Sequence, residues 1–130
     1  MILREVLHAH IPMLARGATI RDAVDRMDVY QFPALVIVDE DRRPLAVITE
    51  GDVCRAAARR DSVLSLGTDP ALAHASLSPT TAGPDMEIGD ALHRMLSSGL
   101  TILPVVEGGM LSGIVLRMDL IQAMLMDAAS

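Results

Sequence analysis

The chain has 130 residues, enough to bury a core of its own; 51% are hydrophobic but only Tyr30 and Phe32 are aromatic, so the core must be aliphatic and rich in methionine. The formal net charge of -6 argues against nucleic acid or an anionic membrane as the main partner. All 11 basic residues are arginine. The absence of lysine and asparagine excludes a phosphate loop ending in Gly-Lys-Ser/Thr, a lysine Schiff base and a Cys-His-Asn nucleophile.

The hydrophobic pattern predicts the same order of elements in each half of the chain. In chain order, the predicted elements are an edge strand around 11–15, a helix from residue 20, strands over 35–38 and 46–48, a helix over 51–60, an edge strand around 76–82, a helix from residue 88, strands over 102–106 and 113–115, and a helix over 117–127. One face of the first helix is marked by four apolar residues spaced three, four and seven positions apart: Ile20, Ala23, Val24 and Met27.

The two halves are copies of each other. Residues 20–27 read Ile-Arg-Asp-Ala-Val-Asp-Arg-Met, and residues 88–95 read Ile-Gly-Asp-Ala-Leu-His-Arg-Met. We therefore predict an α+β fold of two β-α-β-β-α domains, 1–65 and 66–130. Because a unit of about 60 residues is marginal alone, we expect the two to pack sheet against sheet with quasi-two-fold symmetry, which would leave two equivalent clefts between them.

The chain carries no sign of a membrane or secretory segment. No apolar run approaches the roughly 18 residues that a spanning helix needs, and Met1 opens onto Arg4 and Glu5 instead of a signal-peptide core. The single cysteine, Cys54, cannot form an internal disulfide or a multi-cysteine zinc site. We expect a cytoplasmic protein in which Cys54 is a buried, inert thiol.

One motif occurs at the end of both repeats, as Ala-Val-Ile-Thr-Glu-Gly-Asp in 46–52 and Gly-Ile-Val-Leu-Arg-Met-Asp in 113–119. With this motif in register twice, essentially the whole chain resembles a tandem pair of cystathionine β-synthase (CBS) domains, a Bateman module. The resemblance implies a regulatory module without an active site. It also implies that the Gly-x-x-Ser/Thr-x-x-Asp segment binds the ribose and phosphate of an adenosine ligand such as AMP, ADP, ATP, S-adenosylmethionine or NAD.

The chemistry of the first motif admits two interpretations. Thr49 stands where a strand ends and a helix begins, so its hydroxyl and the backbone N–H groups of the helix start are suited to a phosphate. Asp52 offers two acceptor oxygens for a pair of ribose hydroxyls. The same spacing is also an ordinary helix N-cap, with Thr49 as the cap and Asp52 as an acid in the first turn. The two roles are compatible in one residue.

The two repeats are expected to differ as binding sites. In the first, the ligand-binding residues are predicted to be Thr49, Asp52, Ala34, Leu35 and Val47, although Ala46 replaces the glycine of the pattern. In the second, Leu116 replaces the hydroxyl residue, and only Asp119 and Arg117 remain as candidates. An arginine in the first turn opposes the helix dipole, so we interpret this second site as degenerate.

No metal or catalytic site is predicted. His8, His10 and His74 are scattered and have no carboxylate or cysteine at ligand spacing, so they are expected to be solvated. There is no paired-carboxylate arrangement and no nucleophile elbow, which argues against an enzyme.

The last helix is apolar over a wider arc than one buried face requires, because its apolar residues include Met118, Leu120, Ile121, Met124 and Leu125. This excess points to a protein contact. Modules that the chain resembles commonly pair through their helices, so the resemblance implies a homodimer that forms through the helices. The favoured function is a stand-alone regulatory protein that binds an adenosine-containing ligand, requires no cofactor and acts on a separate protein target. The alternative is a ligand-free interaction scaffold of the same fold.

Overall fold

The computed structural model describes residues 1–129, which fall into two compact units. The first-repeat unit is the continuous stretch Pro12–Pro79, and the second-repeat unit combines Met1–Ile11 with the chain from Thr80 onward. This division differs from the predicted domains 1–65 and 66–130. Leu3 is completely buried in the core of the second-repeat unit, whereas Leu66 and Ala71 belong to the core of the first.

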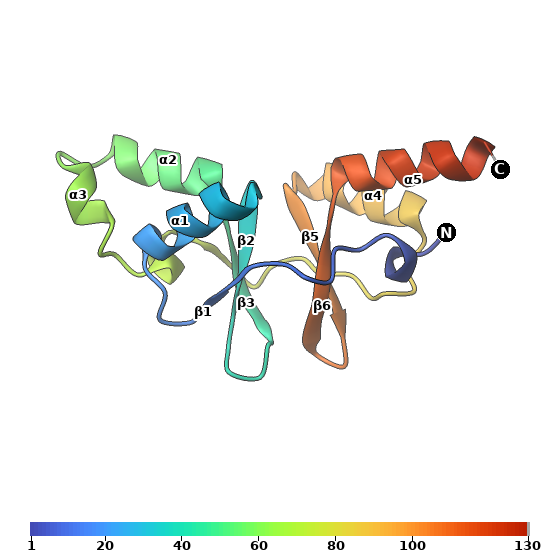
Figure 1. Cartoon of the computed structure of the whole chain (residues 1–130), viewed down its shortest axis with the longest axis horizontal. Helices are drawn as coiled ribbons and strands as arrows, with labels where there is room; N and C mark the ends of the chain where they lie inside the picture. The colour runs from blue at the N-terminus through green and yellow to red at the C-terminus, as the bar shows by residue number, and fades with distance from the viewer. Residues whose placement is uncertain (130) are drawn as a thin grey trace. The chain divides into compact units, whose positions relative to one another are not determined.

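The first-repeat unit is built around a mixed four-stranded sheet. Its elements are β1 (Met13–Ala15), α1 (Ile20–Tyr30), β2 (Ala34–Val38), β3 (Pro44–Thr49), α2 (Glu50–Ala58), the single turn α3 (Val63–Leu66), the 3-10 turn η2 (Ala71–His74) and β4 (Ser76–Leu77). The strand order is β1-β2-β3-β4, with β1 parallel to β2 and the other neighbours antiparallel. Helices α1 and α2 lie on the same side of this sheet (Figure 1).

Helix α1 forms where the spacing predicts it. Thr19 caps it, since the Thr19 hydroxyl accepts from the Asp22 N–H and the Asp22 carboxylate accepts from the Thr19 N–H. Three of the four residues predicted on its buried face are buried, but Val24 is 39% exposed at the edge of that face. The helix ends at Gln31, whose φ of 57° lies in the left-handed region.

The second-repeat unit has the same plan with a shorter sheet. Its elements are the 3-10 turn η1 (Leu3–Glu5), α4 (Ile88–Ser98), β5 (Ile102–Glu107), β6 (Met110–Leu116) and α5 (Arg117–Ala129). Strands β5 and β6 pair antiparallel, and Ala82 bridges Val105 in parallel where the first unit has β1 beside β2. The predicted edge strand at 76–82 is thus divided between two sheets, because Ser76–Leu77 pairs with β3 and Ala82 with β5.

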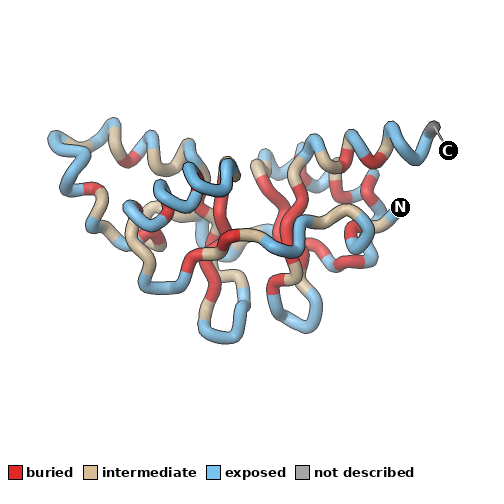
Figure 2. The backbone as a smooth tube through the Cα atoms, in the orientation of Figure 1, coloured by how far each residue is buried: buried red, intermediate tan, exposed pale blue. Residues whose placement is uncertain are grey.

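Side-chain contacts repeat along with the backbone. The Arg26 guanidinium donates to the carbonyl of Met13 at 2.7 Å, and the equivalent Arg94 donates to the carbonyl of Thr81 at 2.9 Å. In both units, buried residues gather on the strands and on the helix turns that face them (Figure 2). The predicted α+β fold of two repeats is confirmed.

In each unit, one edge of the sheet pairs with the segment that precedes the other repeat in the sequence. Ser76–Leu77 leads into the second repeat but pairs with β3 of the first-repeat unit. His8 leads into the first repeat but pairs with Ile114 of β6, through a His8 N–H to Ile114 carbonyl bond of 2.8 Å and a return bond of 3.1 Å. The first eleven residues are therefore structural parts of the second-repeat unit.

Candidate functional site

The first-repeat motif lies at the junction of β3 and α2. Thr49 is the last residue of β3 and caps α2: its hydroxyl accepts from the Asp52 N–H at 3.1 Å, and its own N–H donates to Asp52 Oδ2 at 2.9 Å. Thr49 and Asp52 therefore form a capping box, as one of the two interpretations predicts. The arrangement fixes the Asp52 side chain at the start of the helix, where the positive end of the helix dipole favours negative charge.

Arg55 completes the surroundings of Asp52. Its Nη2 lies 2.7 Å from Asp52 Oδ1, so both carboxylate oxygens are engaged. The Asp52 side chain is only 14% exposed, whereas that of Arg55 is 63% exposed. The guanidinium lies over the first turn of α2, because a Cβ added at Gly51 would stand 3.1 Å from Arg55 Nη1. A ligand hydroxyl could reach Asp52 Oδ1 if the exposed Arg55 side chain rotated away from it.

The other residues predicted for the first site lie in the sheet beside this junction. Ala34 pairs with Thr49, and both Ala34 and Leu35 are buried. Leu35 is part of the hydrophobic core, so its side chain packs inside the unit and only its backbone would be available to an adenine edge. Val47 is half-buried on β3. The structure thus brings all five predicted residues to two neighbouring strands and the helix start that follows them.

The second-repeat motif has a different set of partners. Asp119 Oδ2 accepts from the Leu116 N–H at 2.8 Å, which reproduces half of a capping box without the hydroxyl. The same oxygen lies 2.8 Å from His8 Nε2. Arg117, the other predicted residue, is exposed on the first turn of α5. Sequence reasoning missed both basic partners: Arg55 lies three positions from Asp52 and could have been found by helical spacing, but His8 lies 111 positions from Asp119.

The glycine of the pattern has a structural role in the second repeat. A Cβ added at Gly113 would stand 2.3 Å from the carbonyl oxygen of His8 and 2.7 Å from the side chain of Leu7. The N-terminal segment thus approaches β6 at a distance that only glycine allows. In the first repeat, Ala46 occupies the matching position and is completely buried opposite Leu77.

A pocket of about 720 Å³ lies between α1 and α2 in the first-repeat unit. Its lining consists of Val24, Met27, Asp28, Gln31, Phe32, Pro33, Glu50, Val53 and Cys54. The prediction that Cys54 is buried was wrong, because its thiol is exposed. Helix α2 directs Val53, Ala56 and Ala57 toward the core, and Cys54 lies beside that stripe.

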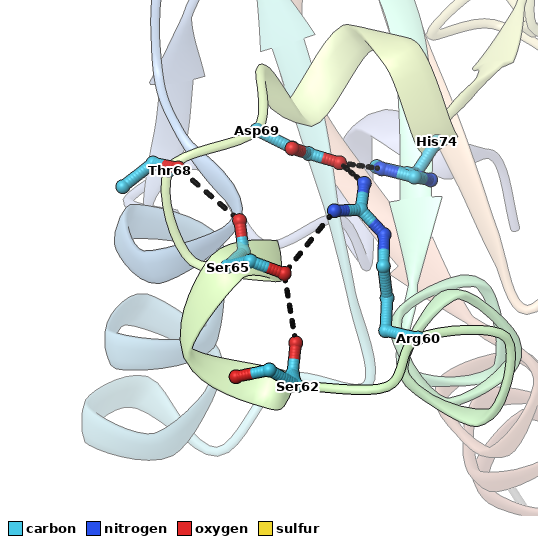
Figure 3. Close-up of polar contacts among 6 residues, drawn as sticks. All are labelled: Arg60, Ser62, Ser65, Thr68, Asp69 and His74. Carbon is cyan, nitrogen blue, oxygen red and sulfur yellow. Dashed lines mark hydrogen bonds and ion pairs between the residues drawn. The ribbon is translucent and has the colours of Figure 1, made fainter.

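A separate polar cluster lies in the segment that follows α2 (Figure 3). Asp69 Oδ2 accepts from the Arg60 guanidinium and lies 2.8 Å from His74 Nε2. The hydrogen bond with His74 lowers the pKa of the Asp69 carboxyl from its ordinary value, and the positive charge of Arg60 acts in the same direction. The cluster joins Arg60, Asp69 and His74, all within 60–74. Of the three histidines expected to be solvated, His8 and His10 are exposed and His74 is partly buried, and His74 and His8 each contact a carboxylate. Among residues 1–129 no group of three or more metal-ligating side chains comes together.

Comparison with known proteins identifies the repeat. A model of the CBS domain matches residues 3–59 and 75–126. The chain belongs to the CBS-domain family. It is 33% identical over 110 residues to an uncharacterized 17.7 kDa protein of Acidianus ambivalens and 32% identical over 102 residues to an uncharacterized protein of Methanopyrus kandleri. These matches cover 84% and 75% of this chain, which spans 64% and 49% of the two relatives' lengths.

Solved CBS-domain structures share the fold. A CBS-domain containing protein from Agrobacterium tumefaciens superimposes with a TM-score of 0.84 at 18% identity, covering 95% of this chain and 99% of that one. CBSX2, solved in complex with AMP, gives a TM-score of 0.85 at 18% identity, covering 98% of each chain. The CBS domain pair of protein MJ0100, in complex with 5'-methylthioadenosine and S-adenosyl-L-methionine, gives 0.81 at 20% identity, covering 100% and 98%.

These findings identify a CBS pair and so confirm the family resemblance. Over residues 1–129, none of the CBS pair's helices has both the length and the apolar character that crossing a membrane requires.

Proposed function

We propose that this CBS pair is a regulatory protein that binds an adenosine-containing ligand at the first-repeat motif. The observation that carries the proposal is the Thr49–Asp52 pair, which presents a hydroxyl and a carboxylate together at the start of α2. Thr49 would contact phosphate, Asp52 the ribose hydroxyls, and the backbone at Ala34 and Leu35 the adenine. The AMP and S-adenosyl-L-methionine bound to two proteins of this fold support the ligand class.

The regulatory part of the proposal rests on the family and on the chemistry of the chain. Binding would stabilise one conformation of the CBS pair and so change its contact with a separate protein target. No cofactor is required for this role, and we propose that the chain does not itself catalyse a reaction.

Thermal unfolding with millimolar AMP, ADP, ATP, S-adenosylmethionine or NAD, with and without Mg²⁺, tests the proposal. A ligand present at about 100 times its Kd adds about 2.7 kcal/mol, which raises the Tm by about 10 °C for a chain of this size. No shift with any of these compounds would contradict ligand binding.

A pair of variants locates the site. Asp52→Ala is expected to abolish the ligand-induced shift, because it removes the ribose acceptor. Asp22→Ala is the matched control, since Thr19 and Asp22 form the same capping box at the start of α1. Both variants lose a capping acid, so they should lose similar stability. Ligand binding retained in Asp52→Ala, or ligand binding lost in both variants, would contradict the assignment.

The alternative function is a ligand-free interaction scaffold. One observation favours it: Arg55 and the Thr49 N–H already engage both oxygens of Asp52, as expected if the motif only caps α2. Under this alternative the wild-type Tm is insensitive to all five compounds, while Asp52→Ala still lowers it.

We also propose a homodimer that forms through the helices. Met118 and Leu125 lie seven positions apart on one face of α5 and are 69% and 65% exposed, and Leu96 on the neighbouring α4 is 61% exposed. Light scattering on the purified protein should give twice the chain mass, and Leu125→Glu should halve it. Leu64→Glu is the control, because Leu64 is 90% exposed on α3 and should leave the mass unchanged. A wild-type monomer would contradict the proposal.

A further inference from the structure

The Asp119 carboxylate of the second repeat is already bound by a side chain of the same unit. Oδ2 lies 2.8 Å from the Leu116 N–H and 2.8 Å from His8 Nε2. A carboxylate can only accept, so the histidine nitrogen is the donor. An imidazole N–H therefore binds Oδ2, the oxygen that also accepts from the helix-start N–H, on the carboxylate that the family motif would present to a ligand hydroxyl.

The backbone holds His8 in this place. Both hydrogen bonds between His8 and Ile114 fix the residue on the edge of β6, and Leu3, a few positions earlier, is completely buried in the core of the unit. Gly113 lets the His8 backbone approach β6 closely. The imidazole therefore extends from an anchored segment, and it can leave Asp119 only by rotating its own side chain.

The first repeat differs at the same point. Arg55, the partner of Asp52, belongs to the same helix, and its side chain is 63% exposed. The His8 side chain is 43% exposed. Asp52 is thus paired with an exposed arginine of its own helix. Asp119 is paired with a histidine of the N-terminal segment.

We propose that His8 is an internal occupant of the second-repeat motif, that is, a side chain of the protein that takes the place of a ligand hydroxyl on Asp119. The proposal rests on the proposed function, because it describes which of the two motifs accepts the adenosine ligand. Leu116 removes the hydroxyl of the motif and His8 engages the acid. Each chain then binds one ligand, at the first repeat.

Calorimetric titration with AMP as the probe tests this through the number of sites per chain. The wild type and Leu116→Thr are expected to bind one AMP, because His8 still engages Asp119 when the hydroxyl is restored. The double variant Leu116→Thr with His8→Ala is expected to bind two. The matched control combines Leu116→Thr with His10→Ala and should bind one, since His10 is an exposed histidine of the same segment.

Two results overturn the proposal: two sites in Leu116→Thr alone, or a single site in the double variant that lacks His8. The proposed function fails separately, when none of the five adenosine compounds binds. If the wild type does not bind AMP, the occupancy of Asp119 is decided without a ligand. Carbodiimide labelling followed by mass spectrometry should modify Asp119 several-fold faster in His8→Ala than in the wild type or His10→Ala. Equal labelling in all three proteins would overturn the proposal.

Discussion

Replacing Gly113 by alanine tests how closely the N-terminal segment packs on β6. The new Cβ would stand 2.3 Å from the His8 carbonyl oxygen, so the backbone of the segment must move. Moving it breaks the two hydrogen bonds between His8 and Ile114, each worth about 1 kcal/mol. The remaining overpacking adds about 1 kcal/mol or more.

We therefore expect Gly113→Ala to lower the free energy of unfolding by about 2–4 kcal/mol. With an unfolding entropy of about 2.1 cal/mol/K per residue, this is a fall in Tm of about 7–15 °C. The loss would be larger if Leu3 also left the core. Thermal and urea unfolding followed by circular dichroism measure both quantities.

Gly89→Ala is the matched control. Gly89 lies in α4 of the same unit, and an added Cβ there meets no atom within 4 Å. Alanine favours a helix over glycine by about 1 kcal/mol, so this variant should be slightly more stable than the wild type. A Gly113→Ala protein within about 0.5 kcal/mol of the wild type, the ordinary range for a surface substitution, would refute the close packing.

Three further outcomes are expected. Thr49→Ala and Thr19→Ala should each lower the free energy of unfolding, measured with urea, by about 1 kcal/mol, because each removes the cap of a helix. Thr49→Ser should restore this stability. The lowered pKa of Asp69 stabilises the fold above the ordinary carboxyl pKa of 3.8, and this contribution is lost as the pH falls through the lowered value. The Tm difference between the wild type and Asp69→Asn should therefore shrink in melts below about pH 4, and a constant difference would contradict the ion-pair cluster. Cys54 should react with Ellman's reagent in the native state at the rate of a simple thiol, whereas a need for denaturant would contradict its exposure.

Periodicity in the sequence was sufficient to predict the main elements of both repeats. The seven-residue spacing from Ile20 to Met27 places both on the buried face of α1, and the internal repeat carries the same argument to α4. Short structures without a period were not predicted. The single turn α3 and the 3-10 turn η2 form because Leu66 and Ala71 reach the core.

The site was predictable only where its contacts are local. The capping box of Thr49 and Asp52 follows from a spacing of three residues. The contact between His8 and Asp119 depends on which sheet edge the N-terminal segment joins, and no spacing in the sequence contains that information. The same long-range pairing displaced the predicted domain boundaries, since a boundary drawn at mid-chain assumes that each half pairs with itself.

The N-terminal segment has a consequence for the order in which the protein folds during synthesis. Residues 12–79 form a continuous unit, so their contacts become available as soon as this stretch has left the ribosome. Leu3 is made before this stretch, yet its packing partners in 82–123 are made after it. Until then an apolar side chain that ends fully buried remains uncovered on the nascent chain. Leu3 is therefore synthesised before residues 12–79 but reaches its final place after them.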